Sequence, residues 1–203
     1  MSLATQELAA HFAPFQSLRL KQDILGVKWR VAGDAVVDQD RWLPQIALGL
    51  QFKRDRGVSG IEGLGVTNVK QLGAAKDRGV DLNLSATKLF LAQSLLLNGN
   101  VRLTRANQFG LLGFGGDKQN QYQTRFEFSG AYLVSRHWVA GLEYRMKPQN
   151  LTFDNEKDAW DVFVAWLPNK NVSLTAAWVD LGDITTFKPK RQKGWYLSLQ
   201  TGF

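Results

Sequence analysis

Two histidines, His11 and His137, are the only imidazoles in the 203-residue sequence that could serve as a general base. A catalytic serine needs such a base within hydrogen-bond reach, oriented in turn by a carboxylate. His137 belongs to Ser135-Arg136-His137, which has the composition of a tight turn, and His11 is expected in a loop. No Ser–His–Asp arrangement follows from these positions, so the sequence predicts a protein that is not an enzyme.

Cysteine is absent, which excludes a zinc site built on thiolates and a framework of disulfides. The run Gly110-Leu111-Leu112-Gly113-Phe114-Gly115-Gly116 invites a phosphate-loop interpretation, but it lacks a Lys-Ser/Thr ending and a following helix. We interpret it as a flexible, partly apolar outer loop that could fold inward. The sequence therefore predicts no metal and no cofactor.

Charged residues recur at every second position of segments whose other positions are apolar. Because successive strand residues point to opposite faces, such segments form strands with one apolar and one polar face. In a barrel the polar face points into the lumen, and the charged residues on it are Lys28, Arg30, Arg102, Arg125, Glu127, Glu143, Arg145 and Asp161. They form either charge pairs that fill a narrow interior or a slightly basic pore that favours anions. About ten strands enclose little free space, which favours the filled or narrow interior.

The elements that position these residues are strands. Residues 122–134 show the alternation most fully, and it recurs in residues 25–32, 45–52, 80–87, 100–104, 138–147, 160–166, 172–179 and 195–203. With a short first strand near residues 2–8, this predicts about ten strands, each near the ~9–11 residues that a tilted membrane strand requires. Pro148, Pro168 and Pro189 are expected between strands, where they remove no ladder hydrogen bond. No linker interrupts the pattern, so residues 1–203 are expected to form one domain.

The connections between these strands alternate in length. Ser135-Arg136-His137 and Pro168-Asn169-Lys170 have the composition of tight turns, whereas residues 54–78, 107–121, 149–157 and 183–193 are long and polar. Short turns at one rim and long loops at the other are typical of outer-membrane barrels.

The two tight turns also predict the pairing of their strands. Around the first turn, Glu127 should face Arg145 and Phe128 should face Tyr144; around the second, Trp160 should face Trp178. Side chains of like character then meet on each face of the sheet.

Aromatic residues occupy the apolar faces, most of them near strand ends. Tyr122 and Tyr132 are separated by about 25 Å of membrane height in a strand tilted by ~40°. Rings with an apolar body and a polar tip suit the two membrane interfaces. The predicted interface aromatics are Trp29, Tyr122, Tyr132, Trp138, Tyr144, Trp160, Trp166, Trp178 and Trp195.

The last strand ends on an aromatic carboxyl terminus. Trp195, Leu197, Leu199 and Phe203 share its apolar face. This resembles the C-terminal signal by which the barrel-assembly machinery recognises and inserts outer-membrane proteins. That machinery is therefore an expected partner.

The net charge of +7 indicates either an anionic partner or a solvated basic surface. Single-stranded nucleic acid requires basic residues interleaved with stacking aromatics on one face, whereas here charges and aromatics lie on opposite faces. Basic loop residues such as Lys70, Lys118, Lys157 and the run 188–193 would meet lipopolysaccharide phosphates at the long-loop rim or remain ordinary solvated side chains. The expected partners are outer-membrane lipid and lipopolysaccharide, not nucleic acid.

The N-terminus does not look like an export signal, because residues 1–6 have neither a basic nor an apolar region. An outer-membrane protein must be exported. We therefore expect the beginning of the protein to be missing from this sequence.

Four segments carry a resemblance to a known family: LKQDILGVK (residues 20–28), DAVVDQD (34–40), NQFGLLGFGGDK (107–118) and DVFVAWLPNK (161–170). Over most of the chain the sequence resembles an uncharacterised proteobacterial outer-membrane family known only as a domain of unknown function. The resemblance implies a barrel with a signal peptide and further strands before this point, about twelve strands in all. It implies no activity, because the family has none assigned.

Taken together, these features predict an all-β, antiparallel transmembrane β-barrel of the bacterial outer membrane, acting as a narrow passive pore or a structural envelope protein. One alternative is a barrel that moves small hydrophobic compounds through an inward-folded Gly-Phe loop. The other is a soluble β-sandwich or lipocalin-like binding protein, in which Phe126, Phe128, Trp160 and Val164 would pack together inside.

Overall fold

The computed structural model describes residues 2–12, 16–35, 41–59, 67–152, 156–183 and 191–202, and antiparallel strands dominate them. Ten strands form one sheet in which each pairs with the next along the chain, in the order β1-β2-β3-β5-β6-β8-β9-β10-β11-β12. Their bounds are β1 Ser2–Phe12, β2 Gln16–Ala32, β3 Gln45–Ser59, β5 Arg78–Phe90, β6 Leu95–Thr104, β8 Gln123–Leu133, β9 Trp138–Arg145, β10 Ala159–Asn169, β11 Val172–Asp180 and β12 Lys193–Thr201. The all-β, antiparallel prediction is confirmed. Three strands, β2, β3 and β5, exceed the ~9–11 residues expected of a tilted membrane strand, with 17, 15 and 13 residues.

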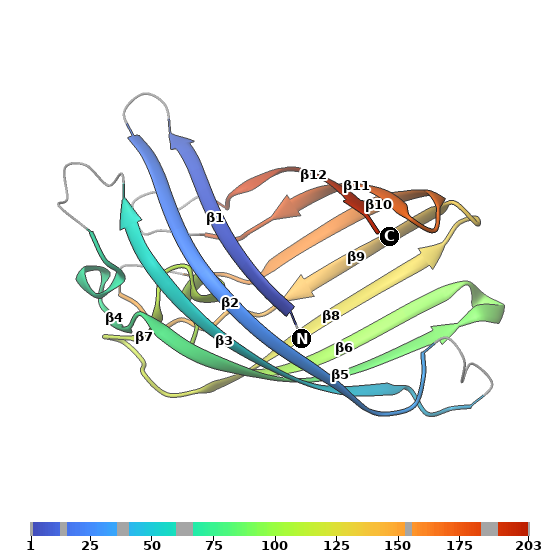
Figure 1. Ribbon diagram of the computed structural model, residues 1–203, viewed down its shortest axis with the longest axis horizontal. Helices are drawn as coiled ribbons and strands as arrows, with labels where there is room; N and C mark the ends of the chain where they lie inside the picture. The colour runs from blue at the N-terminus through green and yellow to red at the C-terminus, as the bar shows by residue number, and fades with distance from the viewer. Residues whose placement is uncertain are drawn as a thin grey trace.

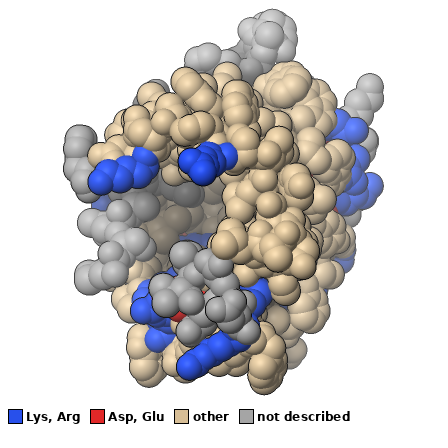
Figure 2. Space-filling view, turned by 90° about the vertical axis from the view of Figure 1, so that its right-hand side faces the viewer, with Lys and Arg blue, Asp and Glu red and all other residues tan. Residues whose placement is uncertain are grey.

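The sheet bends around an interior, with β5 and β6 below it and β10 and β11 above it in Figure 1. β1 and β12 stand at the two ends of the strand order and do not pair with each other within the described residues. Figure 2 faces the end of the molecule with the short turns and shows it hollowed, with Lys and Arg side chains at the edges of the hollow.

Smaller elements lie between the long strands. β4 (Ala74–Lys76) and β7 (Phe114–Gly116) form a separate two-stranded sheet at the end that is on the left in Figure 1. Short 3-10 helices occur at η1 (Val69–Leu72), η2 (Leu91–Gln93) and η3 (Asn107–Gly110). Among the described residues, no helix is both long and apolar enough to cross a membrane.

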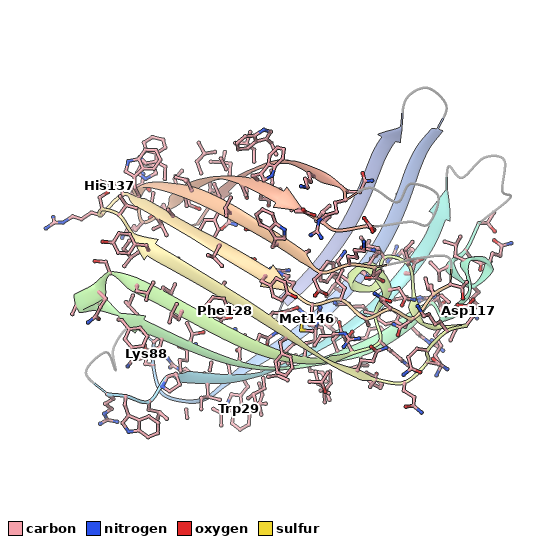
Figure 3. The ribbon with its side chains drawn as sticks, turned by 180° about the vertical axis from the view of Figure 1, so that it is seen from behind. Trp29, Lys88, Asp117, Phe128, His137 and Met146 are labelled. Atoms are coloured by element: carbon pink, nitrogen blue, oxygen red, sulfur yellow. The ribbon has the colours of Figure 1, made fainter. Side chains whose placement is uncertain are left out.

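The two faces of the sheet carry different side chains, as the alternation predicts. Large apolar side chains such as Leu48, Leu84 and Val162 stay about half exposed on the convex face, and Trp29 points away from the sheet in Figure 3. Polar side chains such as Gln51 and Asn100 line a cavity on the concave face. The chain therefore places its apolar side chains outward and encloses its polar ones.

The connections separate into two ends. Residues 60–77, 105–122, 146–158 and 181–192 connect strands at one end, and the short links 91–94, 134–137 and 170–171 connect them at the other. Figure 3 shows this separation, with Asp117 at the long-loop end and His137 at the short-turn end. Two connections depart from this division: the connection 33–44 between β2 and β3 is long although it lies at the short-turn end, and β1 and β2 are only three residues apart at the long-loop end.

The predicted register around the first tight turn is confirmed, since Glu127 pairs with Arg145 and Phe128 with Tyr144. The predicted register around the second turn is wrong by two residues, because Trp178 lies opposite Val162 and Trp160 lies opposite Asp180. The faces are unchanged, because a shift by two residues returns every side chain to the same side.

The physical reason is the position of the second turn. β10 continues through Pro168 to Asn169, with a register shift between Trp166 and Asn169, so Pro168 lies in a strand and not between strands as predicted. The Asn169 side chain accepts a hydrogen bond from the Asn171 backbone N–H at 2.9 Å, which fixes a tight turn at 170–171. Pro148 follows β9 as predicted, and Pro189 lies outside the described residues.

The prediction for His11 is also wrong. This residue belongs to β1, which extends to Phe12 and pairs with β2, where we expected a loop. The register continues to the end of β1, with His11 opposite Ser17, so a longer hairpin replaces the expected short first strand.

Candidate functional site

The interior holds a cavity of about 560 Å³ against β2, β3, β5, β6, β8 and β9, which we call the first compartment. The charged residues in its lining are Lys28, Lys53, Arg102, Glu127 and Arg145. Gln51, Asn83, Asn98 and Asn100 add amide groups, and Phe109 and Leu111 close the cavity on the loop side. The lining is polar and predominantly cationic.

The glycine-rich segment between β6 and β8 folds into the interior. Gln108 and Phe109, two consecutive residues of η3, adopt left-handed backbone conformations with φ of 44° and 60°. Non-glycine residues rarely adopt this conformation, and it persists only where the surroundings enforce it. A Cβ atom at Gly110 would collide with the Gln22 side chain of β2, so the loop lies directly against the opposite wall.

Hydrogen bonds from β3 and from the connection between β9 and β10 hold this loop in place. Lys53 Nζ of β3 donates to the Phe109 carbonyl oxygen at 3.2 Å. The Gln108 backbone N–H donates to Glu156 Oε1 at 2.8 Å, and Lys147 Nζ donates to Gln108 Oε1 at 3.3 Å. The segment that we expected to be a flexible outer loop is therefore an anchored, inward-folded loop, and Phe114 within it is completely buried.

The Phe109 ring is surrounded by cations. The guanidinium carbons of Arg102 and Arg145 lie 5.2 Å and 6.0 Å from the ring centroid, and Lys147 Nζ lies 5.9 Å from it. Each distance is within the range of a cation–π contact. These cations come from β6, from β9 and from the connection that follows β9, so they hold the ring in the interior beside this part of the sheet.

A second compartment of about 540 Å³ lies on the other side of Phe109, against β9 to β12. Phe109 and Arg145 line both compartments, so the two cavities meet at these residues. Phe163, Val179 and Tyr196 make much of the second lining apolar, while Glu143 and Asp161 place two carboxylates in it. Gly141 lies opposite Phe163, whose ring occupies the space that a side chain at position 141 would need.

Ion pairs neutralise most of the interior charge. Lys53 and Asp81 form a fully enclosed pair at 2.7 Å, and Asp81 also accepts a hydrogen bond from Thr104. Arg102 pairs with Glu127 at 2.9 Å, and Arg145 pairs with Glu143 at 2.9 Å. Glu127 thus lies opposite Arg145 in the register but forms its ion pair with Arg102 of β6.

The structure brings six of the eight predicted lumen residues to the compartments: Lys28, Arg102 and Glu127 line the first, Glu143 and Asp161 line the second, and Arg145 lines both. The other two lie elsewhere. Arg30 forms an ion pair with Asp34 near the end of β2 with the short turns. Arg125 lies opposite Arg102 and donates hydrogen bonds to the Gln123 side chain and the Thr124 carbonyl oxygen.

The predicted interface aromatics fall into two groups, one near each end of the sheet. The group near the long loops consists of Tyr122, Tyr144, Trp160, Trp178 and Trp195. The group near the short turns consists of Trp29, Tyr132, Trp138 and Trp166. Several contact each other across strands: Trp138 stacks on Trp166 with ring centroids 6.3 Å apart, and Trp178 meets Trp195 edge-on at 5.3 Å. All except Trp178 are exposed.

The residues of the predicted C-terminal signal lie on β12. Trp195, Leu197 and Leu199 share its outer face and are more exposed than most apolar residues of inner strands, because no strand among the described residues pairs with the far edge of β12. Phe203 lies outside the described residues.

The anchoring residues Lys53, Asp81, Lys147 and Glu156, together with Phe109, are not among the predicted site residues. Asp81 and Lys147 sit at polar positions of the predicted segments 80–87 and 138–147, and Lys53 continues the polar positions of segment 45–52, so the period of two could have identified all three. Glu156 and Phe109 lie in connections, where no periodic signal exists. His137 lies at the short-turn end, its ring nitrogen 2.8 Å from the Leu167 carbonyl oxygen, and within the described residues no cluster of three or more potential metal ligands occurs.

The loops at the long-loop end pack on each other outside the interior. A small buried cluster joins apolar residues from three different connections: Val69, Leu72, Ala74, Leu112 and Leu151. Asp117 joins the same connections: its Oδ1 accepts hydrogen bonds from the backbone N–H groups of Thr152 at 2.9 Å and Lys118 at 3.0 Å, and its own N–H donates to the Gly73 carbonyl oxygen. This platform supports the base of the inward-folded loop.

Acidification is expected to loosen this platform. The hydrogen bonds from Thr152, followed by that from Lys118, hold the pKa of the Asp117 carboxyl below its ordinary value. A carboxylate with a lowered native pKa stabilises the folded state above its unfolded pKa of about 3.9, and this contribution is lost as pH falls through the native pKa. The protection factor of the Thr152 amide, which compares its exchange rate with that of the unfolded chain at the same pH, should therefore fall below about pH 4.

The matched control is Asp117→Asn, in which the protection factor at Thr152 should be low and nearly independent of pH in this range. Equal acid sensitivity of the unmodified protein and D117N would show that another group controls the platform.

Comparison with known proteins adds one match. A family described as "Protein of unknown function (DUF3034)" matches residues 1–200. Neither the curated proteins nor the solved structures include a significant match. The two compartments must therefore be interpreted from their own geometry.

Proposed function

Since the chain belongs to the DUF3034 family of proteins of unknown function, we propose from its geometry that it is an outer-membrane β-barrel acting as a narrow pore, constricted by the inward-folded loop at Phe109. The proposal has two parts, the location in a lipid bilayer and the restricted passage through the lumen. Different observations support each part.

The observation that carries the proposal is the inverted placement of side chains. Four large apolar side chains are exposed on the convex face: Phe126 by 55%, Phe128 by 45%, Trp160 by 37% and Val164 by 46%. The ion pair of Lys53 and Asp81, in contrast, is enclosed. Soluble monomers rarely expose apolar patches larger than a few hundred Å². A bilayer accounts for this surface, because acyl chains solvate apolar side chains and a closed sheet satisfies its own backbone.

The same placement argues against the soluble β-sandwich. In a sandwich the four residues named above would pack together between two sheets. Here they belong to strands of one continuous sheet and point away from its interior. We therefore favour a barrel in which β1 pairs with β12, embedded between lipopolysaccharide and the inner leaflet after insertion by the barrel-assembly machinery.

The polar lining of the first compartment favours a pore for polar solutes over a merely structural role. A structural barrel has no need of amide groups around a cavity of about 560 Å³. The apolar part of the second compartment, with Phe163, Val179 and Tyr196, supports the transport of small hydrophobic compounds as the second candidate function. Single-channel conductance distinguishes the two, because an ion-conducting pore gives steady currents and a hydrophobic path does not.

The location in lipid can be tested with single cysteines, because the chain has none of its own. Val164 lies on the outer face of β10, and its neighbour Ala165 lies on the inner face. Spin labels on Val164→Cys should be relaxed mainly by oxygen, which partitions into acyl chains, and labels on Ala165→Cys mainly by a water-soluble nickel complex. The same alternation is expected for Val162→Cys and Phe163→Cys.

Cell fractionation provides the complementary readout. The protein should require detergent for extraction from the outer-membrane fraction. A detergent-free soluble pool, together with labels at positions 164 and 165 that respond equally to the nickel complex, would contradict the proposed location.

A further inference from the structure

The two compartments differ in their residual charge. After the ion pairs Lys53–Asp81, Arg102–Glu127 and Arg145–Glu143 are set aside, Lys28 remains in the first compartment and Asp161 in the second. Neither side chain makes a hydrogen bond or ion pair within the described residues. One positive and one negative charge therefore face opposite sides of the Phe109 constriction.

From this arrangement we propose that the constriction selects small dipolar solutes, which carry an ammonium and a carboxylate group on one molecule; this inference rests on the proposed pore function. A carboxylate is attracted by Lys28 but repelled by Asp161, and an ammonium group experiences the opposite forces. A free anion or cation is thus opposed by one compartment. A dipolar solute that aligns with the field between the two charges is favoured by both.

The size and lining of the compartments fit such solutes. Volumes of about 560 and 540 Å³ accept molecules of amino-acid size with their water. Asn83 and Gln51 offer amide N–H donors to a carboxylate in the first compartment, whereas the amide donors of Asn98 and Asn100 bind neighbouring groups of the sheet. Tyr196 offers a ring face to an ammonium group in the second.

The alignment of Asp161 with Glu143 strengthens this argument. The two residues lie directly opposite each other on β10 and β9, and like charges at such positions are unfavourable. Arg145 pairs with Glu143, so Asp161 is the carboxylate that an incoming cationic group can neutralise. Arg145 also contacts the Phe109 ring, which places this carboxylate pair beside the constriction.

Liposome swelling with four solutes of similar size tests the proposal: L-serine is dipolar, erythritol neutral, sodium glycerate anionic and choline chloride cationic. Swelling in L-serine should be about two- to fivefold faster than in erythritol, the range expected from partly solvated charge interactions. Glycerate and choline should each be slower than serine. The preference should weaken at high salt, because the screening length falls to about 3 Å at 1 M.

Two variants should remove the preference in opposite ways. Asp161→Asn should reduce the swelling rates in serine and choline and raise that in glycerate, whereas Lys28→Gln should reduce those in serine and glycerate and raise that in choline. Arg30→Gln is the matched control for Lys28, since Arg30 lies on the same strand and face but pairs with Asp34 outside both compartments. R30Q should keep the serine preference.

The outcomes separate this inference from the proposed function. Swelling in erythritol without any advantage for serine would overturn the solute class and leave the pore intact. The absence of swelling in all four solutes, even in a variant without the Phe109 ring, would overturn the pore and the inference together.

Discussion

Phe109→Ala is expected to raise the single-channel conductance of the reconstituted protein by roughly an order of magnitude, because it removes an apolar constriction. Phe109 is one of two residues that line both compartments, and its ring stands where the cavities meet. Without the ring, water can connect the two cavities into one path. The measurement is the current through single molecules in planar bilayers at fixed salt.

The substitution should also cost stability. Three cations surround the ring, and each cation–π contact contributes about 0.5–1 kcal/mol at partly solvated sites. We expect F109A to lower the free energy of unfolding by about 1–3 kcal/mol. The loop itself should stay inward, since its bonds from Lys53 and to Glu156 use backbone atoms of Phe109 and Gln108 and survive the change.

Two variants separate occlusion from general loosening. Phe109→Leu keeps most of the bulk but none of the ring electrostatics, so it should lose stability while the conductance stays low. Phe163→Ala enlarges the second compartment without joining it to the first, because Phe163 lines only one of them. If F163A or F109L opened the pore as far as F109A does, the constriction would not be the Phe109 ring.

The sequence was sufficient to predict which side chains lie on each face of the sheet, because the alternation of side chains along a strand is a local rule. A residue's side is set by counting from its neighbour, so Lys28, Glu127 and Asp161 could be assigned to the interior without knowledge of their partners. The tight turn at residues 135–137 then fixed one hairpin, and its register is confirmed.

The second hairpin shows where local counting fails. The composition of Pro168-Asn169-Lys170 suggested a three-residue loop, but the Asn169 side chain binds the Asn171 backbone and moves the turn forward. A side-chain hydrogen bond that competes with the ladder cannot be weighed from composition alone. The prediction therefore placed Trp178 opposite Trp160, whereas it lies opposite Val162 on the same face of the sheet.

The constriction was beyond sequence reasoning for a different reason. The glycine-rich run suggested that the loop could turn inward, yet its position depends on Lys53 of β3 and on Lys147 and Glu156 of the connection between β9 and β10, two segments distant in the sequence. Such contacts follow only from the assembled sheet.

The ion pairs could not be predicted for the same reason. Glu127 forms its ion pair with Arg102, although its register partner on β9 is Arg145.

Asp81→Asn is expected to destabilise the folded protein by about 3–5 kcal/mol, the usual cost of leaving one member of an enclosed ion pair without its partner. Asp81 is completely buried, lies 2.7 Å from Lys53 Nζ and accepts a hydrogen bond from Thr104. The neutral amide would leave the Lys53 ammonium, itself 4% exposed, without a counter-charge. Urea unfolding in detergent micelles or bilayers, followed by tryptophan fluorescence, measures the loss.

Asp34→Asn is the matched control, because its partner Arg30 is largely exposed and such pairs contribute only about 0–1 kcal/mol. The double variant Lys53→Met, Asp81→Leu should regain most of the stability, since it buries no charge. It should still conduct more than the unmodified protein, because it lacks the bond from Lys53 to the Phe109 carbonyl oxygen that anchors the constricting loop. Equal losses in D81N and D34N would mean that Lys53 finds another counter-charge, and the enclosed pair would then not anchor the loop.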